Sequence, residues 1–519
     1  MTPPERLSTR DRVGFTALGV GMFMALLDVQ IVASSLGELR AGLSASADEI
    51  SWVQTSYLIG EVIMIPLTGF LSRLLSTRIL FALSATGFTL ASIACALATT
   101  LDGMIAARAV QGFLGGAMVP SLFVAIFVLF PPERRGRAMV GVSLLGTLAP
   151  TVGPSLGGWI TEAASWHWLF LINVVPGPLV AVAALLCVRW DKPDPSLARG
   201  FDLPGLLLLA VGLGCLQYVL EDGAKHDWFE DAGILRTTLV AGLCLTLFVA
   251  RVVSYGNPIV SLAAFRDRNF ALGCGYSAML GIGVFGSVFL LVLFLDLVGD
   301  YGTGQIGLIM GVTGLVQLAF APVAAYVADK AEPRWLLAVG MLTFAASFQM
   351  TAGITAEWGL AELALPQALR GIAVSLVFPP VSALALGGLS GAALKDASGV
   401  FNLSRMLGGA VGIALLNALL LEAADRHGIR LSAALAVGNG PAAAALEALA
   451  SRFEARGLAD PERAALASLA ALKQREALVL AFADCQRWMA AVLFVAAALV
   501  PLLRRPGSVE AVRASTGSA

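Results

Sequence analysis

Long apolar runs, separated by short turns and charged clusters, occupy most of the chain. A hydrocarbon core of about 30 Å needs roughly 20 apolar residues in a helix, so each run predicts a membrane-spanning helix. The alternating pattern of a barrel strand is absent. The pattern predicts fourteen spans, which fall near residues 13–34, 51–72, 79–98, 103–127, 138–160, 167–188, 203–220, 236–254, 272–296, 306–328, 335–354, 364–388, 398–421 and 478–503.

Composition agrees with an all-α membrane protein. Of the 519 residues, 58% are hydrophobic and 13% are charged, against roughly 25% charged in an ordinary soluble domain. The mean hydropathy is +0.82. A soluble fold cannot hide so much apolar surface, and a formal net charge of −1 gives no field that would attract nucleic acid. A soluble enzyme, a nucleic-acid-binding protein and a disordered chain are therefore excluded.

The sequence offers no chemistry for a metal, a cofactor or an enzymatic reaction. The six cysteines form no CxxC pair, and the three histidines are far apart. A nucleotide-binding loop and a nucleophile elbow are also absent. We therefore expect no enzyme, no metal site and no cofactor.

Positive charges set the expected orientation. An apolar run follows Arg6, Arg10 and Arg12 and is too long for a signal peptide, so it is the first span. With the N-terminus inside, the outer loops before residue 422 hold only Arg40, Lys225 and Arg236. The positive-inside rule then places both termini in the cytoplasm. The inner segments hold Arg73, Arg78, Arg134, Arg135, Arg137, Arg189, Lys192, Arg199, Arg251, Arg266, Arg268, Lys330, Arg334, Lys395, Arg504 and Arg505.

One connection differs from the others. Residues 422–477 are rich in alanine and carry interspersed charges, which predicts a soluble helical hairpin on the outer face. Two interpretations stay open for it. It is either a solvated spacer or a docking surface for another protein.

A repeat relates the two halves of the chain. Arg108-x-x-Gln111-Gly112 is followed by a proline eight residues after the glycine, and Gln367-x-x-Arg370-Gly371 is followed by a proline at the same spacing. Arginine and glutamine exchange places between the two copies. Such a repeat is typical of transporters that are built from two related bundles.

Ionisable residues within apolar spans are the candidate functional groups. A charge in mid-membrane costs roughly 2.5–3.5 kcal/mol, so each needs a partner or a wet cavity. Helical spacing places polar residues on one face of spans two, four and thirteen. A lined central cavity and buried Asp–Arg or Glu–Arg pairs are both compatible with this pattern. The candidates are Asp28, Glu61 and Arg108 for proton coupling, and Gln54, Gln111, Asp296, Asn402 and Arg405 for a substrate cavity.

A carboxylate in such a cavity can bind a proton at one face of the membrane and release it at the other. Moving one charge across the full potential is worth about 2.3 kcal/mol per 100 mV. This is a physical basis for proton-coupled transport, in which a cationic substrate and a proton would compete for the same carboxylate.

Several stretches resemble one transporter family. "GTLAPTVGPSLGG" at 146–158 resembles motif C, the antiporter signature of drug-efflux members of the major facilitator superfamily. "LLDVQIVASSL" around Asp28, "ARAVQGFLGGAM" at 107–118 and "NLSRMLGGAVG" at 402–412 are similar to further motifs of its 14-span drug:proton antiporters, the EmrB/QacA subfamily. The motif C residues are Gly146, Pro150, Gly153, Pro154, Gly157 and Gly158.

The resemblance implies the major facilitator fold: two six-helix bundles around a central cavity and two extra helices. It also implies efflux of hydrophobic or amphipathic drugs across the inner membrane in exchange for protons, with Arg108 linked to the coupling. Similar proteins work with a periplasmic adaptor and an outer-membrane channel. The expected divisions are a tail at 1–12, a bundle at 13–188, the extra helices at 203–254, a bundle at 272–503 that includes the outer loop 422–477, and a tail at 504–519.

Two other functions remain compatible with the sequence. One is a proton-coupled solute importer of the same fold. The other is a non-transporting membrane sensor or scaffold, in which the buried charges are structural pairs. The direction of transport under an imposed pH gradient distinguishes the first from an exporter, and the absence of substrate-induced proton flux would identify the second.

The expected gating loops depart from the family pattern in the first half. Arg73 and Arg78 lie in the first loop, but an aspartate is usual at the position of Arg73 and a glycine at that of Ser76. This weakens the expectation of the usual gating charge network there. The second copy, "AAYVADKAEPR" at 324–334, keeps the aspartate as Asp329, with Arg334 after it.

Overall fold

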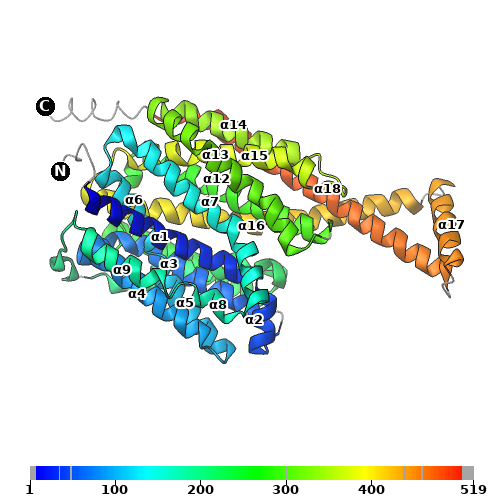
Figure 1. The fold of residues 1–519 in the computed structure, drawn as a ribbon, viewed down its shortest axis with the longest axis horizontal. Coiled ribbons are helices and arrows are strands. Elements are labelled where there is room, and N and C mark those ends of the chain that lie inside the picture. Colours follow the sequence, from blue (N-terminus) through cyan, green and yellow to red (C-terminus); the bar gives the residue numbers. More distant parts are fainter. Residues whose placement is uncertain are drawn as a thin grey trace.

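The computed structural model describes residues 8–33, 35–46, 49–199, 201–256, 258–299, 301–436, 440–456 and 460–504. All the regular elements in these ranges are helices. Figure 1 shows long helices that lie side by side, with the start of the first helix and the end of the last helix toward one end of the molecule. At the other end α17 (Gly440–Ala455) and the helix ends on either side of it project beyond the rest. We call these the terminal end and the projecting end.

The described residues up to Cys187 form nine α-helices. They are α1 (Thr9–Ala33), α2 (Leu36–Leu43), α3 (Trp52–Leu75), α4 (Thr77–Ala96), α5 (Leu101–Gly115), α6 (Met118–Leu129), α7 (Pro132–Ala163), α8 (His167–Leu171) and α9 (Pro176–Cys187).

The rest of the chain forms the remaining α-helices and several short 3₁₀ turns. The helices are α10 (Leu203–Asp222), α11 (Ala232–Ser254), α12 (Arg268–Leu297), α13 (Thr303–Lys330), α14 (Pro333–Thr351), α15 (Leu360–Leu386), α16 (Gly391–Ala436), α17 (Gly440–Ala455) and α18 (Pro461–Leu499).

The helices account for the expected number of spans. Twelve segments within the described ranges are long and apolar enough to cross a bilayer, with α5–α6 and α8–α9 each forming one segment. α7 has 32 residues and packs along α13, and α14 has 19 residues and packs along α15 and α18. If α7 and α14 are counted with these twelve segments, the all-α membrane fold has the expected fourteen spans.

Polar caps fix several helix ends where the chain turns. The Thr100 side chain accepts a hydrogen bond from the Gly103 amide at 3.2 Å, at the start of α5. Asp202 and Asp231 do the same at the starts of α10 and α11. A side-chain oxygen there satisfies an amide that has no partner within the helix, which stabilises a helix start by about 1 kcal/mol.

The spans form two bundles and a peripheral pair. α1 and α3–α9 pack together, and α12–α16 and α18 form a second group. The two groups meet where α3 lies against α16 and where α7 lies against α13 and α15. α10 packs on α3 and α16, while α11 packs on α10 and exposes Leu239, Leu243 and Val253. Exposed apolar residues on an outermost helix are those that a bilayer covers.

The sequence repeat corresponds to equivalent packing in the two bundles. A Cβ atom at Gly112 would lie 2.0 Å from the Tyr57 carbonyl oxygen of α3, and one at Gly371 would lie 2.5 Å from the Thr313 carbonyl oxygen of α13. Only glycine allows the backbones to approach so closely. Each copy of the repeat therefore holds its helix against the second span of its own bundle.

The region predicted as an outer hairpin is continuous with two spans. α16 has 46 residues and α18 has 39, far more than the roughly 20 that a bilayer requires. Their ends project from the bundles, and α17 lies across the tip (Figure 1). Residues 437–439 and 457–459 of this region, and 1–7 and 505–519 of the two predicted tails, lie outside the described residues.

Candidate functional site

A cavity of about 520 Å³ lies between the bundles toward the projecting end. Its volume is within the range of about 300–1,000 Å³ that drug-sized ligands occupy. Its walls come from α1, α3, α7, α10, α12, α13 and α16. The lining is mainly apolar, and its polar side chains are Gln30, Gln54, Gln217, Glu221 and Asp296.

A narrower pocket of about 70 Å³ continues this cavity inward. The two spaces share Val29, Gln30, Leu58, Val284, Phe285 and Met406 in their linings, so they adjoin each other, and together we call them the passage. Glu61 and Arg405 both line the narrow part. The structure therefore brings one predicted carboxylate and one predicted arginine together at the inner end of the cavity.

Glu61 is buried without a partner. Its side chain is 1% exposed, and neither carboxylate oxygen has a hydrogen-bond partner among the described residues. Arg405 directs one nitrogen to the Asn402 Oδ1 atom at 3.2 Å, and its Nε atom is also unpartnered. Because a buried carboxylate without a partner is costly when ionised, Glu61 is a group whose protonation state is free to change.

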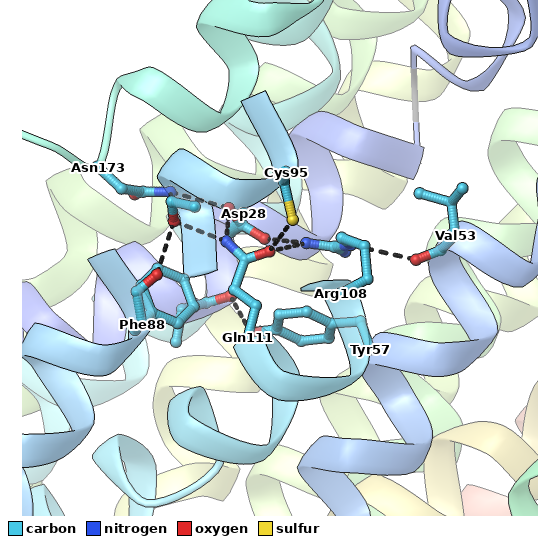
Figure 2. Close-up of polar contacts among 10 residues, drawn as sticks. Asp28, Val53, Tyr57, Phe88, Cys95, Arg108, Gln111 and Asn173 are labelled. Atoms are coloured by element: carbon cyan, nitrogen blue, oxygen red, sulfur yellow. Dashed lines mark hydrogen bonds and ion pairs between the residues drawn. The ribbon is translucent and has the colours of Figure 1, made fainter. Parts of the chain in front are cut away.

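Asp28 has the opposite environment (Figure 2). One carboxylate oxygen accepts a hydrogen bond from Arg108 Nη1 at 2.5 Å. The other accepts from Gln111 and Asn173, both at 2.9 Å. The side chains of Asp28 and Arg108 are both fully buried, so the pair is dry.

Arg108 is also held from its other side. Its Nε atom donates to the Val53 carbonyl oxygen at 3.1 Å, and its guanidinium lies 4.3 Å from the centroid of the Tyr57 ring. These contacts, visible in Figure 2, fix α5 to α1 and α3. The structure thus gives Asp28 the buried pairing that the sequence left as an alternative, and it leaves Glu61 unpaired.

The predicted cavity residues divide into two groups. Gln54 and Asp296 line the cavity and Arg405 lines the narrow pocket. Gln111 and Asn402 are fully buried and are not among the lining residues of these two spaces. Gln111 binds Asp28, and the Asn402 amide donates to the Ser398 carbonyl oxygen at 2.9 Å. Helical spacing identifies a polar face but does not tell whether it points to a cavity or to a neighbouring helix.

The motif C residues follow α7 along the passage. Gly146 lines the narrow pocket and Pro154 lines the wider cavity. A Cβ atom at Gly153 would lie 2.4 Å from the Cβ of Gln30, so α7 and α1 are in close contact there. The carbonyls of Gly157 and Gly158 accept hydrogen bonds from the side chain of Thr161. The side chain of Pro150 lies outside the described residues.

Three polar lining residues were not among the predicted site residues. Gln30 of α1 packs against Gly153 of motif C. Gln217 and Glu221 lie on α10, and a hydrogen bond of 3.1 Å joins their side chains. The spacing of four residues places the last two on one face near the end of their span. That spacing was a usable signal, but the sequence did not show that α10 faces the cavity.

The terminal end of the interface is closed by ion pairs. Arg73 of α3 lies 3.1 Å from Asp396 of α16. Lys395 pairs with Asp191 at 2.6 Å and donates to the Ser72 carbonyl oxygen at 3.1 Å. All of these contacts join the first half of the chain to the second. Arg73, which stands where the family usually has an aspartate, thus has its charge partner across the interface.

The second gating loop makes the equivalent contact with reversed charges. Asp329 of α13 forms an ion pair with Arg137 of α7 and accepts a hydrogen bond from the backbone amide of Arg137 at 3.3 Å. Arg334 instead pairs with Glu332 and donates to the Leu503 carbonyl oxygen. Within the described part of the chain, Arg78 makes neither a hydrogen bond nor an ion pair.

Groups that could hold a metal are not found among the described residues, where no three His, Cys, Asp or Glu side chains gather. All six cysteines are free thiols. The chemical resources of the passage are therefore carboxylates, amides, one arginine and an apolar wall.

Comparisons with known proteins agree on one family. The Major Facilitator Superfamily profile matches residues 18–302. The colistin resistance protein EmrB of Acinetobacter baumannii is 35% identical over 491 residues, which cover 95% of this chain and 96% of that protein. The multidrug export proteins EmrB of Haemophilus influenzae and Escherichia coli are 33% and 31% identical, over 77% and 85% of this chain and 78% and 86% of theirs.

Solved structures share the fold. The human organic anion transporter MFSD10 superposes with a TM-score of 0.61 at 14% identity, covering 94% of this chain and 99% of the other. The proton:xylose symporter XylE gives a TM-score of 0.56 at 15% identity, over 78% and 88% of the two chains. At such identities the likeness concerns the fold alone.

Proposed function

Because the chain belongs to the major facilitator superfamily, and within it to the EmrB subfamily of drug:proton antiporters, we propose that it exports drugs in exchange for protons carried by Glu61. The chain is a multidrug efflux transporter and not an enzyme. Relatives named for multidrug export cover most of its length. The proposal adds which carboxylate couples the proton to the drug.

The isolation of Glu61 is the observation that carries this proposal. A proton carrier must gain and lose its proton during each cycle, so its neutral form must be tolerated where it sits. Glu61 has no hydrogen bond among the described residues to lose on protonation, and it lines the narrow pocket next to the wide cavity. Asp28, by contrast, already accepts three hydrogen bonds, one of them from the guanidinium of Arg108, so a proton on Asp28 would disrupt existing contacts.

We further propose that the terminal end faces the cytoplasm of a cell with an inner membrane. The concentration of arginine and lysine in the loops of that end supports this orientation. The cavity then lies toward the periplasm while the cytoplasmic end is locked, so this conformation releases drug and admits protons. Alternating access exchanges it with a state in which the ion pairs open.

Glu61→Gln tests the proton assignment. The amide has nearly the same shape but cannot carry a proton, so coupling should be lost while the fold is kept. In proteoliposomes with a fixed pH gradient, we expect gradient-driven transport of ethidium to fall at least tenfold. In a drug-sensitive host at equal expression, resistance should fall to that of the empty vector.

Glu230→Gln is the matched control, because Glu230 is exposed on the turn before α11 and lies outside the cavity. Its transport should equal that of the unaltered protein. A Glu61→Gln variant that still accumulates ethidium in response to the pH gradient would exclude Glu61 as the proton carrier.

We also propose that the projecting helices dock a periplasmic adaptor that leads to an outer-membrane channel. In the orientation above, α16 and α18 continue into the periplasm and α17 covers their tip. α16 exceeds the membrane requirement by roughly 26 residues, or about 39 Å of helix. This length supports a binding surface for another protein. A spacer between two spans would need only a short turn.

A further inference from the structure

Helix α10, outside the two six-helix bundles, forms part of the wall of the cavity. It lies against α3 and α16 at the place where the bundles meet. Tyr218 stacks on Trp52 of α3 with ring centroids 5.2 Å apart, which fixes the rotation of α10 about its axis. That rotation directs Gln217 and Glu221 to the cavity.

Glu221 is held at this wall but keeps capacity for a ligand. The Gln217 amide donates to one of its oxygens at 3.1 Å. The nearby Lys225 is engaged with Asp222 at 2.6 Å, so this lysine is committed to another carboxylate. Glu221 forms no ion pair with a described lysine or arginine, so its carboxylate group is available to a ligand in the cavity.

The charges on the wide cavity are all of one sign. Two carboxylates, Glu221 and Asp296, line it, and its described lining includes no lysine, arginine or histidine. The apolar part includes Phe285 and Phe289 of α12. The unpartnered Glu61 adds a third carboxylate at the inner end, where Arg405 supplies the one positive charge.

We propose that Glu221 is a specificity-determining residue, and that the cavity takes compounds with a bulky apolar body and a positive charge. This inference rests on the proposed export function and refines it. The apolar wall contacts the body of the compound, while Glu221 and Asp296 attract the cation as it leaves water. Arg108 does not oppose this preference, because Asp28 neutralises it within the first bundle. The accessory helix thus adds selectivity to a cavity that both bundles share.

Equilibrium binding to the purified full-length protein in nanodiscs tests the assignment. Tetraphenylphosphonium and tetraphenylborate have the same shape and opposite charges, so they separate charge preference from apolar fit. We expect the unaltered protein to bind the phosphonium at least tenfold more tightly than the borate. Glu221→Gln should weaken phosphonium binding about tenfold and leave borate binding unchanged or tighter, and Asp296→Asn should act in the same direction. Glu230→Gln, outside the cavity, should change neither.

Four results would overturn the proposal. The unaltered protein could bind the borate as tightly as the phosphonium, or bind neither. Glu221→Gln could weaken both ligands equally, which would indicate a structural role. It could also weaken neither. The binding assay uses no pH gradient, so it tests the charge preference independently of proton coupling. If only the proton assignment were wrong, Glu61→Gln would still transport ethidium in response to a pH gradient, and the unaltered protein would still prefer the phosphonium.

Discussion

At the scale of single residues, burial alone does not define a role. Asp28 and Glu61 are 2% and 1% exposed, yet one is saturated with donors and the other has none. Asp28 belongs to an ion pair that joins α1 to α5, so its contribution is to the position of helices. Glu61 belongs to the passage. Two carboxylates that the sequence treats alike therefore separate into a structural and an exchangeable group.

Asp28→Asn should destabilise the protein. The substitution leaves the buried guanidinium of Arg108 without its counter-charge, and breaking a buried pair from one side costs about 3–5 kcal/mol. We expect a clear drop in the thermal unfolding midpoint of the purified protein in detergent. Glu61→Gln, which removes no hydrogen bond within the described residues, should melt close to the unaltered protein. Equal midpoints for Asp28→Asn and the unaltered protein would contradict this account of the pair.

At the scale of elements, two equivalent ion pairs hold the terminal end of the interface closed, with the positive and negative partners exchanged between them. The end of α3 supplies Arg73 to the start of α16, and the end of α13 supplies Asp329 to the start of α7. Close approach accompanies both contacts. A Cβ atom at Gly69 would lie 2.7 Å from the Asp396 Cα, and one at Gly136 would lie 2.9 Å from the Ala328 carbonyl oxygen. A positive or a negative side chain at the end of the first helix can close the interface, provided that the partner helix carries the opposite charge.

Reversing Arg73 and Asp396 together should preserve the lock. Arg73→Asp alone places two carboxylates in contact, which should favour opening of the terminal end by a factor of about ten or more, since 1.4 kcal/mol suffices for tenfold. Arg73→Asp with Asp396→Arg restores attraction. Distances between spin labels on the ends of α3 and α16 would measure the populations, with the native cysteines replaced. A double variant as open as the single one would show that the pair does not hold this end closed.

At the scale of the whole molecule, the ion pairs that close the interface and the helices that project from the bundles lie at opposite ends. Ion pairs and tight glycine contacts seal the terminal end, while the cavity and the long helices lie toward the other. A drug that enters the cavity is therefore next to the base of the projection. In the proposed orientation, that placement allows a docked partner to receive the drug directly.

Removing the projection should separate transport from resistance. Lys473 Nζ donates to Ser432 Oγ at 3.0 Å, so a short glycine-serine linker can join Ser432 to Lys473 in place of residues 433–472. Transport of ethidium in proteoliposomes should be unchanged. In Gram-negative cells, resistance should fall severalfold or more, because drug released to the periplasm re-enters. Full resistance in cells at equal expression would identify the projection as a spacer.

The amino-acid sequence by itself determined the class of protein, the spans and the two-fold repeat. These depend on local properties, since about twenty apolar residues cross a bilayer wherever they occur, and glycine spacing permits close helix contact wherever it is found. It also indicated Asp28, Glu61 and Arg108 as candidate functional residues, because a charge in an apolar span is costly unless it has a partner or a wet cavity.

Only the tertiary structure decided what each charge faces. Arg108 lies 80 residues from Asp28 and Asp396 lies more than 300 residues from Arg73, so their pairing depends on how helices pack and not on any local pattern. The same holds for Gln111, which turns to a neighbouring helix, and for Glu221, which reaches the cavity because α10 fits between α3 and α16. Helical periodicity defines faces, and packing alone assigns each face to lipid, protein or water.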